Sequence, residues 1–372
     1  MNAMKIENIE AFKVVIPTSV KYDEAGGTYT SFVRSLVVRL TTDAGQVGVG
    51  DVHESVPGYT SETLDTMYEV VTKTYGPQLK GMDLESVELL HNKMIDSRRG
   101  NNFARCAVEM AAYDALARSR KISICTMLGG PVRNELQLVG GIGIDDLDVV
   151  VKRAVSMVSS GYRTIKLKIG TSNIKEDLLR VKEVRSAVGD EIMIRVDANA
   201  GYLLPDAIRV VRGIADLGVE HFEQPVAREN VAGMAYLMRM GAVSILADES
   251  VHDAYDAIRI ITEGAADGIK IKISKVGGFV EARKIIDIAE AAGVKLIIGN
   301  GICSSIEAAA ELQLACAYSH VYPVAEMVGP AKLSSDLAKV PFNLDQGSIK
   351  LGTGAGLGVE LSEEMLKKLQ IY

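Results

Sequence analysis

The chain has 372 residues, of which 48% are hydrophobic and 24% are charged, and its formal net charge is −7. This composition is typical of a globular protein with a large core, and the length suits two domains of roughly 100–200 residues each. The aliphatic content argues against disorder, and the negative charge argues against nucleic acid or an anionic membrane as the main partner.

Other composition features point to a cytoplasmic protein. No stretch reaches the roughly 18 apolar residues that a membrane-spanning helix needs, and the first residues lack the apolar core of a signal peptide. The four cysteines form no C-x-x-C pair, so buried free thiols are expected. The five histidines form no H-x-H or H-E-x-x-H motif, which disfavours the common zinc sites.

Residues 1–128 are predicted to form an α+β domain. The runs Ile6–Val15 and Phe32–Thr41 have strand composition, and the second continues through Gly45–Asp51 as a hairpin. Residues 102–117 carry apolar side chains at steps of three and four, which indicates a mostly buried helix. A Leu-Gly-Gly-Pro run follows and marks the domain boundary.

Residues 129–331 are predicted to form a β/α barrel. Short, apolar, β-branched runs recur there with amphipathic patterns between them, as parallel strands and their helices require. Eight such units indicate a closed barrel, and no G-x-G-x-x-G follows an early strand to favour an open doubly wound sheet. The predicted strands are Leu136–Ile142, Thr164–Ile169, Glu191–Val196, Val219–Glu223, Val243–Ala247, Gly268–Ile273, Val294–Ile298 and Val321–Ala325.

Residues 332–372 are predicted to return to loop and hairpin structure. The glycine-rich run at 352–358 lacks the Lys-Ser/Thr of a phosphate-binding loop, and no helical pattern clearly follows it. We therefore interpret this run as a turn.

Three carboxylates end consecutive predicted strands. Asp197, Glu223 and Asp248 follow one another at the spacing of one β/α unit, so they should meet at the rim where barrels carry their chemistry. Converging carboxylates repel one another unless a cation lies between them, and oxygen ligands without Cys or His favour Mg²⁺, with Mn²⁺ as a substitute. The sequence predicts this metal site, with Asn199 and Glu249 supporting the ligands.

Three lysines are predicted to carry acid/base chemistry. Lys166 and Lys168 lie two apart on one strand and should both face the barrel interior. Their mutual repulsion and a nearby metal are expected to lower the pKa of Lys168, which would let its neutral amine act as a general base. Lys272 ends the sixth predicted strand, opposite the second in a ring of eight, so a bound substrate would have one lysine on each face.

This arrangement suits removal of the proton next to a carboxylate, because a metal stabilises the charge of the enediolate that forms. Return of a proton on the opposite face gives racemisation or epimerisation, while related paths give cycloisomerisation or β-elimination. We expect an isomerase of a small carboxylic acid, with a dehydratase or other lyase as the alternative. Missing histidine clusters disfavour a hydrolase, a borohydride trap would reveal a Schiff-base aldolase, and the complete set of acids disfavours a non-catalytic binding protein.

At these residues the chain resembles the muconate lactonizing enzyme subgroup of the enolase superfamily, whose members use a Lys or His base with Mg²⁺. The resemblance runs nearly end to end and rests on Ala107–Asp114, Leu128-Gly-Gly130, the K-x-K at 166–168, Asp197-Ala-Asn199, Glu223-Gln-Pro225, Asp248-Glu-Ser250, Lys272 with Lys275-Val-Gly-Gly278, and Gly356-Leu-Gly358. It implies a modified (β/α)₇β barrel, an N-terminal capping domain completed by the C-terminal segment, and a homo-oligomer.

The resemblance also indicates which members of the superfamily this chain differs from. Members similar to mandelate racemase place a catalytic His at the end of the seventh strand, where this chain reads Ile297-Ile-Gly-Asn300-Gly-Ile-Cys303 and has no His. After the eighth predicted strand, Ala325-Glu326-Met-Val-Gly-Pro330 is similar to the Thr-Glu-Leu-Phe-Gly-Pro segment of muconate cycloisomerases. It lacks the Asp-x-Asp that dipeptide epimerases use for the substrate ammonium group. Lys270 stands where relatives often have an uncharged residue, so it needs a partner such as Asp267 or a barrel carboxylate.

Two cap loops over the barrel mouth set specificity in this family, and here they would be Thr18–Thr30 and about His53–Tyr59. The glycine pair at 26–27 suits a lid that excludes water. The candidate substrate contacts are Tyr22, Tyr29, His53, Tyr59, Asn300 and Glu326.

Overall fold

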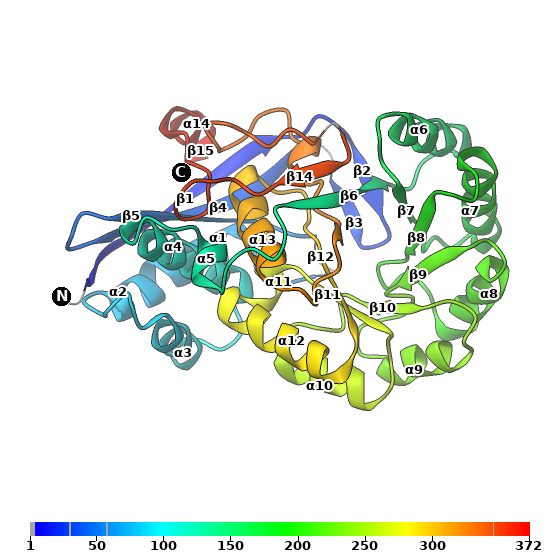
Figure 1. Ribbon diagram of the computed structural model, residues 1–372, viewed down its shortest axis with the longest axis horizontal. Helices are drawn as coiled ribbons and strands as arrows, with labels where there is room; N and C mark the ends of the chain where they lie inside the picture. Colours follow the sequence, from blue (N-terminus) through cyan, green and yellow to red (C-terminus); the bar gives the residue numbers. More distant parts are fainter. Residues whose placement is uncertain (1–3, 30, 57–58, 345) are drawn as a thin grey trace.

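The computed structural model describes residues 4–29, 31–56, 59–344 and 346–372. Figure 1 shows its two parts side by side, a cap built on a small antiparallel sheet and a barrel of parallel strands ringed by helices. The predicted fold class, a β/α barrel with an N-terminal α+β cap, is confirmed.

The cap sheet consists of long antiparallel strands, β1 (Ile6–Pro17), β4 (Phe32–Thr42) and β5 (Val47–His53). Between β1 and β4 the chain forms a small hairpin of β2 (Tyr22–Glu24) and β3 (Gly27–Tyr29). This hairpin contacts the barrel. The backbone carbonyl of Asp23 accepts a hydrogen bond of 2.8 Å from the N–H of Ile144, which lies just after the first barrel strand. The cap loop is therefore anchored at the barrel mouth.

Helices cover one face of the cap sheet. They are α1 (Leu64–Val70), a π-helical turn (Val71–Tyr75), α2 (Gly76–Leu79), α3 (Val87–Ser97), α4 (Asn102–Ser119) and α5 (Ile124–Met127). The predicted burial of α4 is confirmed, and it packs closely on β5. A Cβ at Gly50 would lie 1.9 Å from the carbonyl oxygen of Ala107, so only glycine leaves room for this contact.

The barrel strands run parallel in the order β12-β11-β10-β9-β8-β7-β6-β13. Bridges at Leu296–Val321 and Gly299–Glu326 bring the two ends of this order together, so the barrel is nearly closed. Every predicted barrel strand is present, although several are shorter than predicted. They are β6 (Glu135–Ile142), β7 (Thr164–Lys168), β8 (Met193–Asp197), β9 (Val219–Glu223), β10 (Ile245–Ala247), β11 (Gly268–Ile271), β12 (Lys295–Ile298) and β13 (Val324–Ala325).

Most barrel helices lie outside the ring of strands, as Figure 1 shows. In α8, for example, the buried residues Ala207, Val210, Val211 and Ile214 recur at steps of one, three and four, which gives one apolar face toward the strands. The helices are α6 (Leu147–Ser159), α7 (Ile174–Val188), α8 (Leu204–Ile214), α9 (Val231–Arg239), α10 (Ala254–Thr262), α11 (Ile273–Val276), α12 (Phe279–Ala292) and α13 (Ser305–Ala317). All residues of α13 are buried, because it contacts both the barrel and cap elements such as α5 and β5.

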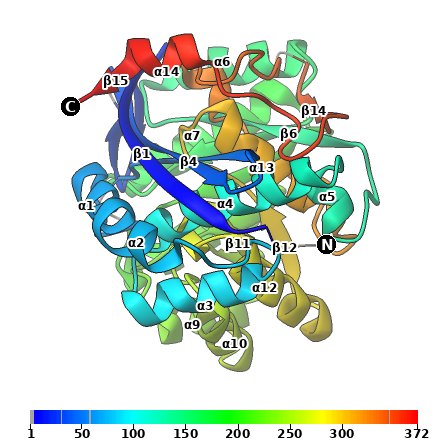
Figure 2. The ribbon, with the colours of Figure 1, turned by 90° about the vertical axis from the view of Figure 1, so that its left-hand side faces the viewer.

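The C-terminal segment returns to both parts of the molecule. After a 3₁₀ turn (Pro330–Lys332), β14 (Ser348–Lys350) pairs with β6, and β15 (Gln370–Ile371) pairs with β1 at the edge of the cap sheet, as Figure 2 shows. The helix α14 (Glu363–Leu369) was not predicted. It is short, but Ser362 caps it, acidic residues begin it and lysines end it, each of which stabilises a helix.

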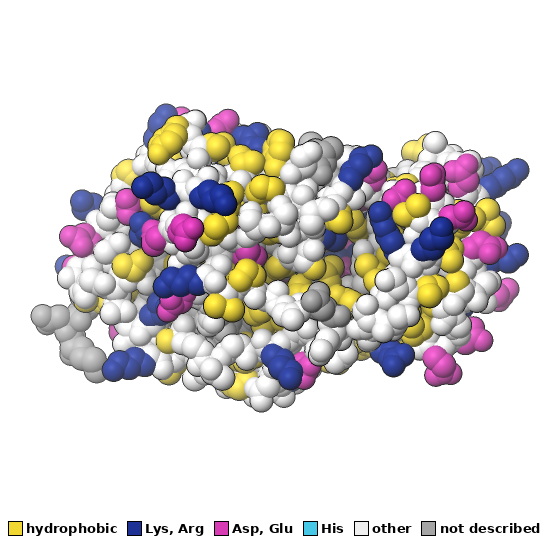
Figure 3. All heavy atoms as spheres, turned by 90° about the horizontal axis from the view of Figure 1, so that it is seen from above, with side chains coloured by type: hydrophobic (Ala, Val, Ile, Leu, Met, Phe, Trp, Pro, Cys, Tyr) yellow, Lys and Arg dark blue, Asp and Glu magenta, His cyan; other side chains and the backbone are white. Residues whose placement is uncertain are grey.

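No helix in the described part of the chain is long and apolar enough to cross a membrane. On the face drawn in Figure 3, the described Lys and Arg side chains are mixed with Asp and Glu.

Candidate active site

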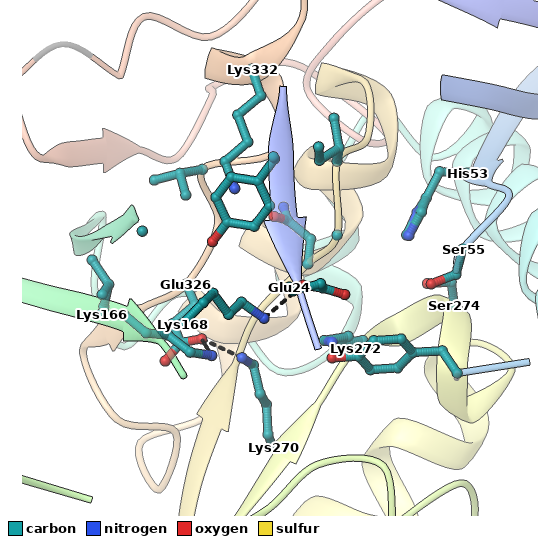
Figure 4. Close-up of a pocket in the computed structure, with 18 of the residues that line it drawn as sticks. Glu24, His53, Ser55, Lys166, Lys168, Lys270, Lys272, Ser274, Glu326 and Lys332 are labelled. Atoms are coloured by element: carbon teal, nitrogen blue, oxygen red, sulfur yellow. Dashed lines mark hydrogen bonds and ion pairs between the residues drawn. The ribbon is translucent and has the colours of Figure 1, made fainter. Parts of the chain in front are cut away.

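A pocket lies between the cap and the carboxyl ends of the barrel strands. Figure 4 shows its lysines pointing inward, with Lys166 and Lys168 on one side and Lys272 on the other. The order of the strands explains this placement, since three strands separate β7 from β11 on either path around the ring. The cap contributes Tyr22, Glu24, His53, Ser55, Tyr59 and Phe103 to the lining.

The predicted metal ligands stand at the ends of three consecutive strands. Asp197 and Glu223 end β8 and β9, Asp248 follows β10 directly, and all three side chains are fully buried. Burial and the charge of Asp197 raise the pKa of Glu223. Burial opposes the charge of Asp248 too, but Lys272 and Lys275 outweigh it and hold its pKa well below the usual value.

Lys168 is held by three oxygen atoms. Its Nζ donates to Oδ2 of Asp197 at 2.9 Å and to Oδ1 of Asn199 at 2.6 Å, and it lies 2.7 Å from Oε2 of Glu24 in the cap hairpin. Burial favours the neutral amine, yet the charges of Asp197 and Glu24 outweigh burial and raise the pKa of Lys168 well above its usual value. Among the described protein groups these two carboxylates outweigh the repulsion from Lys166, so the predicted lowering requires the bound cation that the prediction includes.

Lys166 lies one pleat below Lys168 and joins three carboxylates. Its Nζ is 2.9 Å from Oδ2 of Asp197, 2.8 Å from Oε2 of Glu223 and 2.6 Å from Oε2 of Glu326. Burial disfavours its charge, but these carboxylates raise its pKa well above the usual value. Lys166 is therefore held as a cation in the lining of the pocket.

Lys270, the unusual lysine of the sixth barrel strand, has barrel partners. Its Nζ is 3.0 Å from Oε1 of Glu223 and is also bound to Glu326. Of the two partners predicted, a barrel carboxylate is the one found, and Asp267 instead accepts a hydrogen bond from a backbone N–H. Glu326 lines the pocket as expected for a substrate contact, but its Oε2 is bound to both Lys166 and Lys270, and its Oε1 accepts a hydrogen bond of 3.4 Å from Arg195.

Lys272 enters from the opposite wall, directly after β11. Its Nζ is 2.8 Å from Oδ2 of Asp248 and 3.6 Å from the ring centre of Tyr59. The Tyr59 hydroxyl donates to Oδ2 of Asp248 at 3.2 Å and accepts from Nδ2 of Asn199 at 2.7 Å. Asn199 also donates to Oε1 of Glu249 at 3.0 Å, so the predicted supporting residues connect the cap tyrosine with the strand-end carboxylates.

The other predicted substrate contacts are placed as follows. Tyr22, His53 and Asn300 all line the pocket, and Nδ1 of His53 is 2.8 Å from Oε2 of Glu307. Oδ1 of Asn300 accepts a hydrogen bond from the next loop. The side chain of Tyr29, and also Thr30 and residues 57–58 of the predicted cap loops, lie outside the described residues.

Two charged residues of the pocket were not predicted. Glu24 contacts Lys168, and Lys332 reaches the pocket from the 3₁₀ turn after β13. The only sequence signal for Glu24 was its place in the predicted cap loop Thr18–Thr30. For Lys332 there was no signal, because a lone lysine after Gly-Pro is typical of exposed turns.

The predicted ligands Asp197, Glu223 and Asp248 offer the oxygen donors that a hard divalent cation prefers. Burial raises the pKa values of Glu223 and Glu249, and neighbouring carboxylates add to this while nearby lysines oppose it; a bound cation would remove the repulsion between the carboxylates. Oε2 of Glu249 is buried without a hydrogen-bond partner. One group of three described residues, His221, Glu223 and Glu326, has potential ligand atoms all within 4.8 Å of one another, and it shares only Glu223 with the predicted set.

Comparison with known families agrees with this geometry. Residues 149–365 match the enolase C-terminal domain-like family, and residues 22–129 match the N-terminal domain of mandelate racemase and muconate lactonizing enzyme. The chain belongs to the enolase superfamily. Within it, the N-succinyl-L-Arg/Lys racemase of Bacillus cereus is 28% identical over 372 residues, covering 99% of both chains.

Solved structures of the superfamily superpose closely. Muconate lactonizing enzyme from Pseudomonas fluorescens, complexed with muconolactone, gives a TM-score of 0.96 at 29% identity and covers 100% of both chains. Dipeptide epimerase from Enterococcus faecalis V583, complexed with Mg and the dipeptide L-Leu-L-Tyr, gives 0.91 at 32% identity and covers 96% of this chain and 99% of that one. These superfamily relatives are isomerases, in agreement with the predicted enzyme class, and one of them is complexed with Mg.

Proposed function

We propose that this protein is a Mg²⁺-dependent isomerase, a racemase, epimerase or cycloisomerase, that removes the proton next to a carboxylate of a small organic acid. The observation that supports this most is the placement of Lys168 and Lys272 on opposite barrel strands, facing one pocket, with buried carboxylates between them. The named relatives add support, since racemisation, dipeptide epimerisation and muconate cycloisomerisation are all isomerisations.

Asp197, Glu223 and Asp248 are the proposed ligands of the ion. Bound Mg²⁺ supplies positive charge at the substrate carboxylate, where negative charge develops as the proton leaves. Asn199 and Glu249 orient the ligands through the hydrogen bonds that connect them. The alternative set around His221 suits Mg²⁺ less well, because one of its three donors is an imidazole, whereas Mg²⁺ prefers oxygen ligands.

The proton steps belong to the lysines. The neutral amine of Lys168 takes the proton from one face, and the ammonium of Lys272 donates a proton to the other face. The roles exchange for the opposite stereoisomer. Lys168 can act only when one of its three contacts is released, and Glu24 is the one carried by the cap hairpin rather than by the barrel.

The cap residues Tyr22 and Tyr59 close the pocket on the solvent side. Both are largely buried, and Tyr59 holds Asn199 and Asp248 through its hydroxyl. Exclusion of water strengthens the charge interactions inside the pocket. The cap therefore acts as more than a lid, because it contacts the proposed metal ligands directly.

The test is exchange of the α-proton for deuterium, followed by NMR in D₂O with Mg²⁺ and a panel of carboxylates offered as separate stereoisomers. In Lys168→Ala and Lys272→Ala, interconversion of stereoisomers should be lost. Each variant should keep exchange on the face served by its remaining lysine and lose about 10²–10⁴-fold on the other. Lys175→Ala removes an exposed lysine of the next helix and should behave as wild type.

Calorimetry separates binding from chemistry. Mg²⁺ should bind both lysine variants, whereas Asp248→Asn should weaken Mg²⁺ binding by about tenfold or more. Unchanged binding in Asp248→Asn would favour the set around His221 instead. Full activity in either lysine variant contradicts the assigned roles, and an elimination product without stereoisomer interconversion identifies the lyase.

A further inference from the structure

Lys332 differs from the other lysines of the pocket. The others each lie within 3.0 Å of at least one carboxylate oxygen: Lys166, Lys168, Lys270 and Lys272. No ion pair connects Lys332 to any described carboxylate. Its Nζ instead lies over the ring of Tyr22, 3.4 Å from the ring centre, and Figure 4 shows the side chain reaching down into the pocket toward that ring.

The position of Lys332 is fixed from both parts of the molecule. Its backbone N–H donates to the carbonyl of Gly329 at 3.1 Å, and its carbonyl accepts from the N–H of Ser19 in the cap at 2.8 Å. The Tyr22 ring holds the ammonium through a cation–π contact. Beneath it lies Gly141, where an added Cβ would stand 4.0 Å from Nζ, so the ammonium sits in the pocket wall above β6.

This ammonium is poorly compensated. Burial first, and then the charge of Lys168, lower the pKa of Lys332 to about 7. Glu24 is the carboxylate that acts on it most strongly, but Oε2 of Glu24 is already bound to Lys168. A half-buried cation without an anionic partner costs free energy that a bound anion returns.

We propose that Lys332 binds a second carboxylate of the substrate, and that the enzyme prefers dianionic acids. This inference rests on the proposed function, which places the reacting carboxylate between Lys168 and Lys272. Lys332 enters the pocket beside Gly141 of β6, and Figure 4 shows it apart from Lys272, so it meets the distal end of an extended substrate.

The chemistry of the relatives agrees with this class. An N-succinyl amino acid and a muconate each carry two carboxylates, whereas a dipeptide presents an ammonium group that Lys332 would repel. We therefore expect N-acyl amino acids with an acidic acyl group, or dicarboxylic acids, to bind better than dipeptides.

The test compares N-succinylglycine with N-butanoylglycine, which have the same length and differ by a terminal carboxylate against a methyl group. In calorimetry with Mg²⁺ present, wild type should bind N-succinylglycine about 10–100-fold more tightly, as expected for a charge-assisted contact. Lys332→Met should remove this preference while leaving the affinity for N-butanoylglycine unchanged, and Lys332→Arg should restore part of it. The control is Lys339→Met, an exposed lysine paired with Glu360 in the same C-terminal segment.

Equal binding of the two compounds by wild type, or an unchanged preference in Lys332→Met, overturns the inference. Near-ultraviolet circular dichroism of the variants shows whether the fold is retained, and Lys332→Arg provides a second reading if Lys332→Met is unfolded. Deuterium exchange at the glycine α-carbon separates the two proposals. If α-protons exchange but N-succinylglycine is not preferred, the proposed function stands and the inference about Lys332 fails. If N-succinylglycine is preferred but no carboxylate in the panel exchanges its α-proton, the anion site at Lys332 stands and the proposed function fails.

Discussion

The carboxyl group of Asp51 joins the cap to the barrel and should control how stability depends on pH. It is fully buried near the end of β5. Oγ of Ser35 donates to its Oδ1 at 2.5 Å, and Oγ of Ser304, at the start of α13, donates to its Oδ2 at 2.6 Å. Burial, and after it the charge of Glu307, raise the pKa of Asp51 from 3.8 to about 7.

The sign follows from proton uptake on folding. Between pH 4 and pH 7 the folded chain keeps a proton on Asp51 that the unfolded chain has lost. The contribution to stability is therefore complete below about pH 4 and is lost as the pH rises to about 7. Three pH units at about 1.4 kcal/mol each give a total loss of about 4 kcal/mol, of which about 3 kcal/mol falls between pH 5 and pH 8.

Asp51→Asn removes this titration while keeping one acceptor and one donor for the two serines. Urea unfolding across pH 5–8 should show wild type losing about 3 kcal/mol more than the variant as the pH rises. Asp190→Asn, at an exposed position, should run parallel to wild type. If the curves of wild type and Asp51→Asn are parallel, Asp51 ionises without penalty and the reasoning fails.

Two further predictions concern the cap. Gly50→Ala forces a Cβ against the carbonyl of Ala107, so the free energy of unfolding should fall by about 3 kcal/mol or the chain should not fold. Urea unfolding followed by circular dichroism measures this change. An unchanged urea midpoint would mean that α4 is free to shift. Glu24→Gln removes an anion that raises the pKa of Lys168, so the acid limb of the pH profile of deuterium exchange should move to lower pH; an unmoved limb would show that Glu24 does not act on the base.

Much of the barrel was predictable because its signals are local. Short β-branched runs between amphipathic segments indicate parallel strands, and period-two alternation places Lys166 and Lys168 on one face. The spacing of one β/α unit brings Asp197, Glu223 and Asp248 to neighbouring strand ends, where the structure has them. Consecutive barrel strands are neighbours in space, so chain order alone predicts these contacts.

The short elements were harder to predict. The helix α14 covers only seven residues, and it docks on β1 from the far end of the chain. Local sequence carries little information about a helix of this length, because most of its stability comes from packing. The ends of the barrel strands also depend on packing, so several strands are shorter than predicted although their positions in the chain agree with the prediction.

Local sequence patterns were enough to predict which barrel strands form, their order and the acidic and basic side chains at the ends of those strands. The distances between those groups depend on the tertiary structure, and with them the directions of their pKa shifts. Glu24 and Lys168 are distant along the chain yet 2.7 Å apart, and the charge of Glu24 adds to that of Asp197 in raising the pKa of the lysine. Charge interactions vary with the distance between groups and with burial, and both are set by how the cap hairpin and the last turn dock on the barrel.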